Sequence, residues 1–328
     1  MKVTRVQETK INSVDFENLV FGKTFTDHMF LCHFRDGKWQ TPEIKPYQAL
    51  TLDPSASVFH YGQAVFEGMK AFKDDNEKLW LFRPDENFKR INLSAKRLQI
   101  PEFPESYFFE VLNTMLQLDQ EWVRPGSGNS LYIRPFVFAS QPSVQASASM
   151  EYTFMIICAP VKSYYSGGEI NVLIAEEYRR AANGGVGYAK AAGNYAAQFY
   201  PTSEALKKGF QQIIWTDAST HEYLEEAGTM NIFFKINGTL ITSPTNDRIL
   251  DGITRKSIIA IAKHEDIPVE VFGTGTAVVV LPIHSFSHQE TAYTLPKQTP
   301  LALKLKEKLV GIQYNASEDT FGWRQAVN

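Results

Sequence analysis

The spacing of hydrophobic residues along the first half of the chain predicts strands, then two helices, then strands again. Residues 85–98 place apolar side chains at the three- and four-residue spacing of one helix face, with acids in the first turn. Alternating or continuous apolar runs of strand length surround this region. The expected elements are a hairpin over 27–39 turning at Asp36-Gly37, paired strands over 64–72 and 78–82, helices over 85–98 and 105–122, and strands over 130–140 and 151–160.

In the second half, apolar strand patterns are interleaved with helical ones. We expect strands over 170–177, 210–217 and 276–283, a hairpin turning at Asn237-Gly238, and helices over 194–209, 252–265 and 301–312. Residues 161–169 are polar and broken by Gly167-Gly168, which is typical of a linker. The pattern therefore predicts two α+β halves, a small N-terminal α/β domain over 1–160 and a larger C-terminal domain over 170–328, joined by that linker.

Composition narrows the class of protein. A chain of 328 residues, 44% of them hydrophobic, buries roughly 75% of its unfolded surface. The net charge is −3 without a basic stripe, which argues against nucleic-acid binding. No apolar run approaches the ~20 residues of a membrane helix, and the N-terminal residues do not resemble a secretory leader. We expect a cytoplasmic protein.

Thiol and metal chemistry are poorly supported. Cys32 and Cys158 both lie in apolar runs without a CxxC spacing, so we expect two small buried side chains. No HExxH motif is present, because Glu225 stands where the second histidine would be, and neither GxSxG nor GxGxxG opens a helix after a strand. We expect no metal site.

Lys190 is the only charged residue in the stretch GGVGYAKAAGNYAAQ, residues 184–198. The glycines allow another group to approach the backbone closely, and the alanines around the lysine would desolvate its ammonium group. A desolvated lysine suits a Schiff base with an aldehyde cofactor. The alternatives are an ordinary solvated loop lysine, and Lys70 as the reactive one, although Lys70 lies in a strand pattern where it can point outward.

Glu226 lies at the entrance of an apolar strand, in HEYLEEAGTMNIFF. It is either a surface charge or a carboxylate that pairs with a cationic ring nitrogen. A pyridoxal ring withdraws electrons only while its nitrogen stays protonated, and a charge-assisted hydrogen bond of about 1.5–3 kcal/mol would hold that proton.

Two turns could hold a phosphate group. A helix begins after Gly252, so the amides of Ile253 and Thr254 can point at an anion. FGTGTA places two glycines before Thr276, in a nest-like turn. Similar turns also occur in loops that bind nothing, so neither identifies a phosphate site alone.

In combination, these stretches are similar to those of the branched-chain amino-acid aminotransferases, class-IV pyridoxal-phosphate enzymes of fold type IV. The resemblance spans residues 20–283 and rests on FGKTFTDHM, YGQAVFEGMKAF, LFRPDENFKR, LYIRPF, YAKAAGNYAA, LEEAGTMNIFF, LDGITRKS and FGTGTA. Two features depart from the family. The connection before Phe272 is shorter than usual, and Val278 and Leu281 stand where some relatives carry a CxxC redox pair, which excludes a thiol switch there.

The resemblance implies pyridoxal 5'-phosphate as the cofactor and assigns roles to its contacts. Lys190 would form the Schiff base and carry the proton, Tyr195 would bind the phenolic oxygen, and Glu226 would hold the pyridine nitrogen with Thr229 close by. The residues implied to bind the phosphate are Arg90, Ile253, Thr254 and Thr276.

For the substrate, the resemblance implies that the amides of Thr276 and Ala277, helped by Tyr132, meet the α-carboxylate. Arg134 would accept the second carboxylate of glutamate. The aromatic residues implied to wall the aliphatic pocket are Phe21, Tyr61, Phe66 and Tyr164.

The implied fold is a two-domain α/β (α+β) protein whose larger C-terminal domain has a β-barrel-like sheet surrounded by helices. The implied reaction is reversible, ping-pong transfer of the amino group of L-leucine, L-isoleucine or L-valine to 2-oxoglutarate, in a homodimer. The alternatives are another class-IV enzyme, such as a D-amino-acid aminotransferase or an aminodeoxychorismate lyase, and a pyridoxal-binding protein without activity.

Overall fold

The structure, a computed structural model, describes residues 1–162, 169–236, 239–266, 272–275, 279–289, 291–295 and 300–327. The chain divides into two compact units. The first unit contains residues 1–164, 189–192 and 312–328, and the second contains 165–188 and 193–311. Each unit has its own sheet and its own hydrophobic core. The domain limits expected from the sequence stay predictions, since most of the proposed linker lies outside the described residues.

The first unit is built on a ten-stranded sheet with the order β1-β4-β2-β9-β8-β6-β7-β18, in which β3 pairs with β2 and β5 with β8. Nearly all neighbours are antiparallel; only β1 and β4 are parallel. The strands are β1 Lys2–Val3, β2 His28–Arg35, β3 Lys38–Trp39, β4 Glu43–Pro46, β5 Ala64–Phe66, β6 Met69–Lys73, β7 Leu79–Phe82, β8 Ser130–Ala139, β9 Tyr152–Val161 and β18 Arg324–Ala326.

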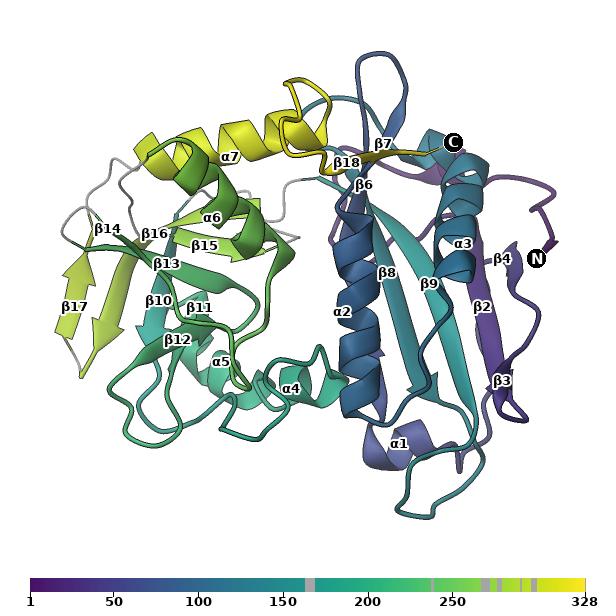
Figure 1. The fold of residues 1–328 in the computed structure, drawn as a ribbon, viewed down its shortest axis with the longest axis horizontal. Coiled ribbons are helices and arrows are strands. Elements are labelled where there is room, and N and C mark those ends of the chain that lie inside the picture. The colour runs from purple at the N-terminus through teal and green to yellow at the C-terminus, as the bar shows by residue number, and fades with distance from the viewer. Residues whose placement is uncertain are drawn as a thin grey trace. The chain divides into compact units, whose positions relative to one another are not determined.

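Strands β8 and β9 are buried along almost their whole length, because the sheet is covered on both faces. Figure 1 shows α2 (Pro84–Arg97) and α3 (Glu105–Leu118) lying across one face, where they contribute to the largest core cluster. A smaller cluster around Met29 and Phe138 fills the other face, and a residue of α1 (Ser57–Tyr61) packs on it. Two 3-10 turns, η1 (Ile11–Ser13) and η2 (Gln120–Trp122), complete the unit.

The hairpin at Asp36-Gly37 and the helices starting near residues 85 and 105 are confirmed. The expectation of one continuous strand over 64–72 is wrong. The strand is interrupted at Glu67-Gly68, and its two parts, β5 and β6, pair separately with β8. The interruption lies opposite Pro135 of β8, which has no backbone N–H to donate, although the Glu67 amide still donates to the Pro135 carbonyl.

The second unit carries an eight-stranded mixed sheet of order β12-β11-β10-β16-β15-β13-β14, with β17 paired to β16. β10 lies parallel to both β11 and β16, and the remaining pairs are antiparallel. The strands are β10 Ile170–Ile174, β11 Gln212–Thr216, β12 Leu224–Ala227, β13 Asn231–Ile236, β14 Thr239–Ile241, β15 Phe272–Gly275, β16 Val279–His288 and β17 Thr291–Thr294.

The helices of the second unit are α4 (Ala192–Ala196, which starts in the first unit), α5 (Phe199–Lys207), α6 (Ile253–His264) and α7 (Pro300–Gln313, which ends in it). The single helix expected over 194–209 is wrong, because it is divided between α4 and α5. At the break, the side chain of Gln198 donates to the carbonyl of Asn194, and its backbone amide donates instead to Tyr195. The helical ladder is therefore interrupted at this residue.

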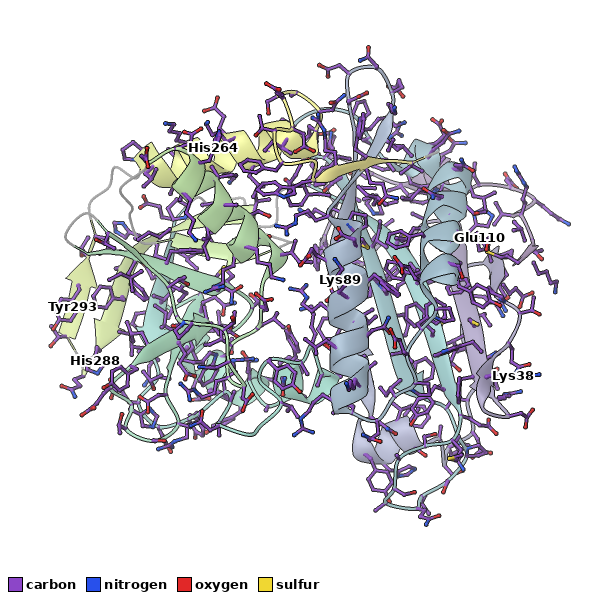
Figure 2. The ribbon with its side chains drawn as sticks, in the orientation of Figure 1. Lys38, Lys89, Glu110, His264, His288 and Tyr293 are labelled. Atoms are coloured by element: carbon purple, nitrogen blue, oxygen red, sulfur yellow. The ribbon has the colours of Figure 1, made fainter. Side chains whose placement is uncertain are left out.

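No helix among the described residues is long and apolar enough to cross a membrane. The same residues contain no group of three or more histidine, cysteine, aspartate and glutamate side chains that could hold a metal ion. Figure 2 shows two of the histidines, His264 and His288, on separate elements, α6 and β16.

Both cysteines are buried and unpaired with each other. Burial raises the pKa of the Cys32 thiol to about 12 and the pKa of the Cys158 thiol well above its ordinary value. Since the thiolate is the reactive form, we expect the native protein to resist iodoacetamide at pH 8, and both thiols to react once the chain is denatured. Mass spectrometry of the alkylated protein measures this, and labelling of either thiol in the native state would contradict it.

Candidate active site

Lys190 belongs to the tetrapeptide 189–192, which is part of the first unit. Its peptide is held on both sides. The Lys190 amide donates to Ser94 Oγ at 2.9 Å, the Phe66 amide donates to the Lys190 carbonyl at 3.1 Å, and Ala191 bridges to Val65. The ammonium nitrogen lies 4.5 Å from the centroid of the Phe66 ring. We call Lys190, Phe66, Glu67, Arg90 and Ser94 the lysine cluster.

The centre of the lysine cluster is a fully buried ion pair. Glu67 Oε1 accepts from Arg90 Nε at 2.6 Å, and Oε2 accepts from Arg90 Nη2 at 2.9 Å and from Asn87 Nδ2 at 2.8 Å. Burial alone would raise the pKa of the Glu67 carboxyl, but Arg90, the charge of Lys190 and the Asn87 amide outweigh it, and the pKa lies below its ordinary value. Glu67 is therefore an anion that fixes the guanidinium of Arg90 in a bidentate geometry.

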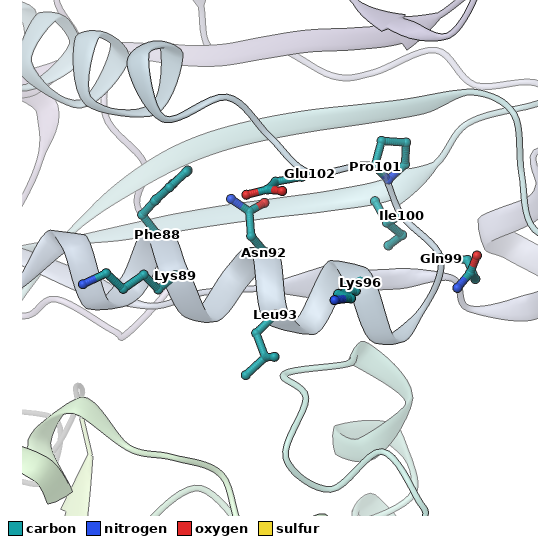
Figure 3. A pocket seen from close by; sticks show the side chains of 9 residues that line it. All are labelled: Phe88, Lys89, Asn92, Leu93, Lys96, Gln99, Ile100, Pro101 and Glu102. Carbon is teal, nitrogen blue, oxygen red and sulfur yellow. The ribbon is translucent and has the colours of Figure 1, made fainter.

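Helix α2 supplies three members of this network from one stripe. Asn87, Arg90 and Ser94 are separated by three and four residues, so they lie on one side of the helix, and all three are buried. A cleft of about 570 Å³ lies along another side of α2 (Figure 3). Its lining residues are Phe88, Lys89, Asn92, Leu93, Lys96, Gln99, Ile100, Pro101 and Glu102. Because none of the expected site residues lines this cleft, we do not assign the active site to it.

Arg134 and Tyr132 lie two residues apart on strand β8, and Arg134 lies beside the aromatic ring of Phe66. The Arg134 guanidinium lies 4.6 Å from the Phe66 centroid and donates to the Tyr132 hydroxyl at 3.0 Å. Phe21 contacts Tyr132 edge-on at 5.0 Å. Arg134 Nε is buried and has no hydrogen-bond partner among the described residues, so this arginine keeps a donor for a further acceptor. A side chain at Gly68 would collide with the Tyr132 hydroxyl, which explains the glycine there.

Tyr61, another residue expected to line the aliphatic pocket, has its hydrogen bond outside the group formed by Phe66, Arg134 and Tyr132. It lies on α1, is 46% exposed, and donates its hydroxyl to the carbonyl of Val144. Tyr164, Thr276 and Ala277 lie outside the described residues, so their expected roles stay predictions.

In the second unit, Glu226 is buried near the end of β12, and its partners include a guanidinium group, a side-chain amide and a backbone amide. Its Oε1 lies 2.7 Å from Arg180 Nη2, while Oε2 accepts from Asn231 Nδ2 at 2.8 Å and from the Leu250 amide at 3.2 Å. The interpretation of Glu226 as a surface charge is therefore wrong. It is a buried carboxylate whose orientation is set by Arg180 and Asn231.

Arg180 also binds the glycine-rich loop that leads to Lys190. Its Nη2 donates to the carbonyl of Gly187 at 2.9 Å and to that of Arg248. Asp247 accepts from the Gly184 amide at 3.0 Å, and its carbonyl accepts from the Tyr188 amide. A methyl group at Gly187 would meet the Arg248 carbonyl oxygen at 2.7 Å, so the close packing of this loop requires the glycine.

The first turn of α6 contains Ile253 and Thr254, both buried, and follows Gly252 as the N-cap. Since glycine has no side chain to cap the helix, the first-turn amides can receive an anion. Thr229 lies exposed in the turn between β12 and β13, and Tyr195 lies half-buried on α4.

Five polar residues whose side chains are buried in or beside the lysine cluster, or around Glu226, were not anticipated from the sequence: Glu67, Asn87, Ser94, Arg180 and Asn231. A signal existed for Glu67, because an acid between apolar residues in a strand pattern needs a buried partner. Nothing comparable distinguishes Ser94 from the other serines of the chain.

Comparison with known proteins identifies the family of the chain. The family model for amino-transferase class IV matches residues 64–286, which include the lysine cluster and the residues around Glu226. The chain belongs to the class IV aminotransferases. This class IV aminotransferase is 44% identical over 339 aligned residues to branched-chain-amino-acid transaminase 1 of Bacillus subtilis, with 95% of each chain covered.

Solved structures are similar to this aminotransferase as well. The Escherichia coli branched-chain amino acid aminotransferase aligns with a TM-score of 0.74 at 25% identity, covering 90% of this chain and 99% of that one. The branched-chain aminotransferase of the thermophilic archaeon Thermoproteus uzoniensis, solved with norvaline, aligns with a TM-score of 0.76 at 24% identity, covering 92% and 100%. The mixed α/β fold of two units is thus that of a class IV aminotransferase.

Proposed function

We propose that this protein is a branched-chain amino-acid aminotransferase that uses pyridoxal 5'-phosphate to transfer the amino group of L-leucine, L-isoleucine or L-valine to 2-oxoglutarate. The observation that carries the proposal is the lysine cluster, in which Lys190 and Arg90 are held by one hydrogen-bond network. The names of the similar proteins support the substrate class. The proposed scheme is ping-pong, with each acid entering in turn.

The residues present fit the chemistry of the cofactor. An amine at Lys190 suits its aldehyde. Within the first unit the buried cation of Arg90 suits a phosphate, and within the second unit the first-turn amides of α6 suit one as well. A buried carboxylate at Glu226, oriented by Arg180, suits a protonated ring nitrogen. Tyr195 and Thr229 complete the proposed cofactor contacts.

When bound, pyridoxal phosphate supplies an electron sink for the bond broken at the substrate's α-carbon. Lys190 would hold the aldehyde carbon of the cofactor, and its free amine would move a proton at the substrate's α-carbon. Arg134, whose Nε keeps an unused donor, binds the side-chain carboxylate of glutamate. Phe66, Phe21 and Tyr61 give the aliphatic acids an apolar wall, with Tyr132 at the α-carboxylate.

We expect the protein to select only modestly among the three aliphatic amino acids. One methylene in an apolar pocket changes the transition-state free energy by only about 1–3 kcal/mol. We therefore expect kcat/KM values for leucine, isoleucine and valine that differ by no more than roughly 200-fold.

An absorption spectrum of the purified protein tests the proposal directly. We expect a visible or near-visible band from the attached cofactor, and its conversion to the pyridoxamine form when L-leucine is added without an oxo acid. L-Glutamate should have the same effect. A band that answers only to D-amino acids would indicate another class IV enzyme, and a band that no amino acid changes would indicate a binding protein. We also propose that the protein is a homodimer and that it lies in the cytoplasm.

Glu226→Gln is expected to lower kcat by roughly 10²–10³-fold while the band is retained. A neutral amide cannot keep a ring nitrogen protonated, but it can still fill the space beside Arg180. Stopped-flow measurement of the half-reaction with leucine gives the rate. Glu222→Gln, which neutralises an exposed acid in the same segment, is the control. Equal rates for Glu226→Gln and the wild type would remove Glu226 from the proposed mechanism.

A further inference from the structure

Ser94 is a fully buried serine on α2 whose hydroxyl connects the backbone of Lys190 to the backbone of Arg90. It donates to the carbonyl of Arg90, four residues earlier, at 2.9 Å, and accepts the amide of Lys190 at 2.9 Å. A serine in a helix interior commonly makes the first of these bonds. The second joins it to a residue 96 positions away in the sequence.

These contacts close a ring made of hydrogen bonds and of the covalent bonds within and between the residues concerned. From Lys190 the ring passes through Ser94 to the backbone of Arg90, then through the Arg90 guanidinium to Glu67. Glu67 is bonded covalently to Phe66, whose amide returns to the Lys190 carbonyl at 3.1 Å. Moving Lys190 therefore requires breaking a bond to α2 or a bond to β5.

We infer that Ser94 is a positioning residue, which fixes the backbone of Lys190 relative to Arg90. The kinetic part of this inference rests on the proposed function. Because a lysine has a long and flexible side chain, a fixed Cα is needed if the amine is to meet the same atom in each proton transfer. A misplacement of about 1 Å lowers a rate by roughly 10²-fold.

The variant Ser94→Ala tests the inference, and helix α2 should persist in it because alanine favours a helix. Amide hydrogen exchange of the full-length protein, resolved to Lys190 by overlapping peptides, should be faster by roughly 2- to 10-fold, the effect of losing one hydrogen bond. With the cofactor added, kcat for leucine should fall by about 10- to 100-fold while KM changes little.

Two further variants complete the design. Thr114→Ala removes a comparable hydroxyl-to-carbonyl bond on α3, from Thr114 Oγ1 to Glu110 at 2.8 Å, and should leave both readouts at wild-type values. Ser94→Thr restores the hydroxyl, since threonine in a helix can also bond to the carbonyl four residues back, and should return both readouts toward the wild type.

The outcomes separate the inference from the proposed function. Unchanged exchange at Lys190 in Ser94→Ala, or equal acceleration in Thr114→Ala, overturns the role of Ser94. A Ser94→Thr protein that melts like the wild type but exchanges like Ser94→Ala also counts against it. If the wild type neither binds pyridoxal phosphate nor transfers an amino group, the proposed function and the kinetic role fail, while exchange still decides whether Ser94 holds Lys190.

Discussion

Replacing Lys190 by alanine is expected to lower the rate of amino-group transfer by roughly 10⁴-fold or more, because one side chain is assigned both covalent attachment and proton transfer. The visible band of the attached cofactor should be lost in the same variant. Stopped-flow absorbance with leucine and 2-oxoglutarate measures the rate, and a spectrum measures the band. Both readouts come from one preparation.

Lys70→Ala is the matched control for that experiment. Lys70 is half-buried on β6, and its backbone pairs with Tyr132, so its side chain can be shortened without breaking the ladder. We expect Lys70→Ala to keep the band and most of the activity. If Lys70→Ala loses the band and Lys190→Ala retains it, the assignment of the reactive lysine is reversed.

Neutralising the buried anion of the lysine cluster is expected to have the largest effect on stability. Glu67→Gln leaves the buried Arg90 without its counter-charge, which costs about 3–5 kcal/mol of unfolding free energy. The exposed pair of Lys162 and Glu17 provides the comparison, since Glu17→Gln should cost no more than about 1 kcal/mol. Urea denaturation of the three proteins measures the difference, and equal losses would show that burial of the Glu67 pair carries no special stabilisation.

The same carboxylate predicts a dependence of stability on pH. Because the folded-state pKa of Glu67 lies below its ordinary value, its contribution is fully present above the unfolded pKa of about 4.3. It is lost as the pH falls through the lower, folded pKa. We therefore expect the free-energy gap between wild type and Glu67→Gln to be constant from pH 6 to 8 and to shrink in acid, as urea titrations at several pH values would show.

Most of the elements follow from local patterns, because helical spacing and continuous apolar strands are properties of neighbouring residues. Helix α2 is an example, with Pro84 and acids at its start and Lys96 and Arg97 in its last turn. The breaks at Glu67 and Gln198 were missed for a different reason. The break at Glu67 lies opposite Pro135 of another strand, which only the strand pairing reveals. The break at Gln198 follows from a side-chain bond to the Asn194 carbonyl, which hydrophobic spacing does not indicate.

The candidate site also contains residues that a local pattern reveals and residues whose role depends on contacts made by the fold. Lys190 could be singled out because it is the only charge among its sequence neighbours, whereas Glu226 shares its segment with Glu222 and Glu225 and is singled out by the family resemblance. Arg180 and Ser94 have ordinary neighbours, and their importance lies in contacts with Glu226 and Lys190, which no local pattern encodes. The family resemblance implies cofactor contacts, but it does not indicate which residues hold those contacts in place.

The first unit is assembled from three separate segments of the chain, 1–164, 189–192 and 312–328. Val65 of strand β5 forms a β-bridge with Ala191. Strand β7 pairs on one edge with β6 and on its other edge with β18, Arg324–Ala326. A ribosome releases these segments in order, so the N-terminal sheet must wait, with an unpaired edge at β7, until the residues of β18 have been made. Folding of the first unit is therefore completed only after the second unit has been synthesised, and a nascent chain stalled before residue 324 is exposed to edge-to-edge aggregation.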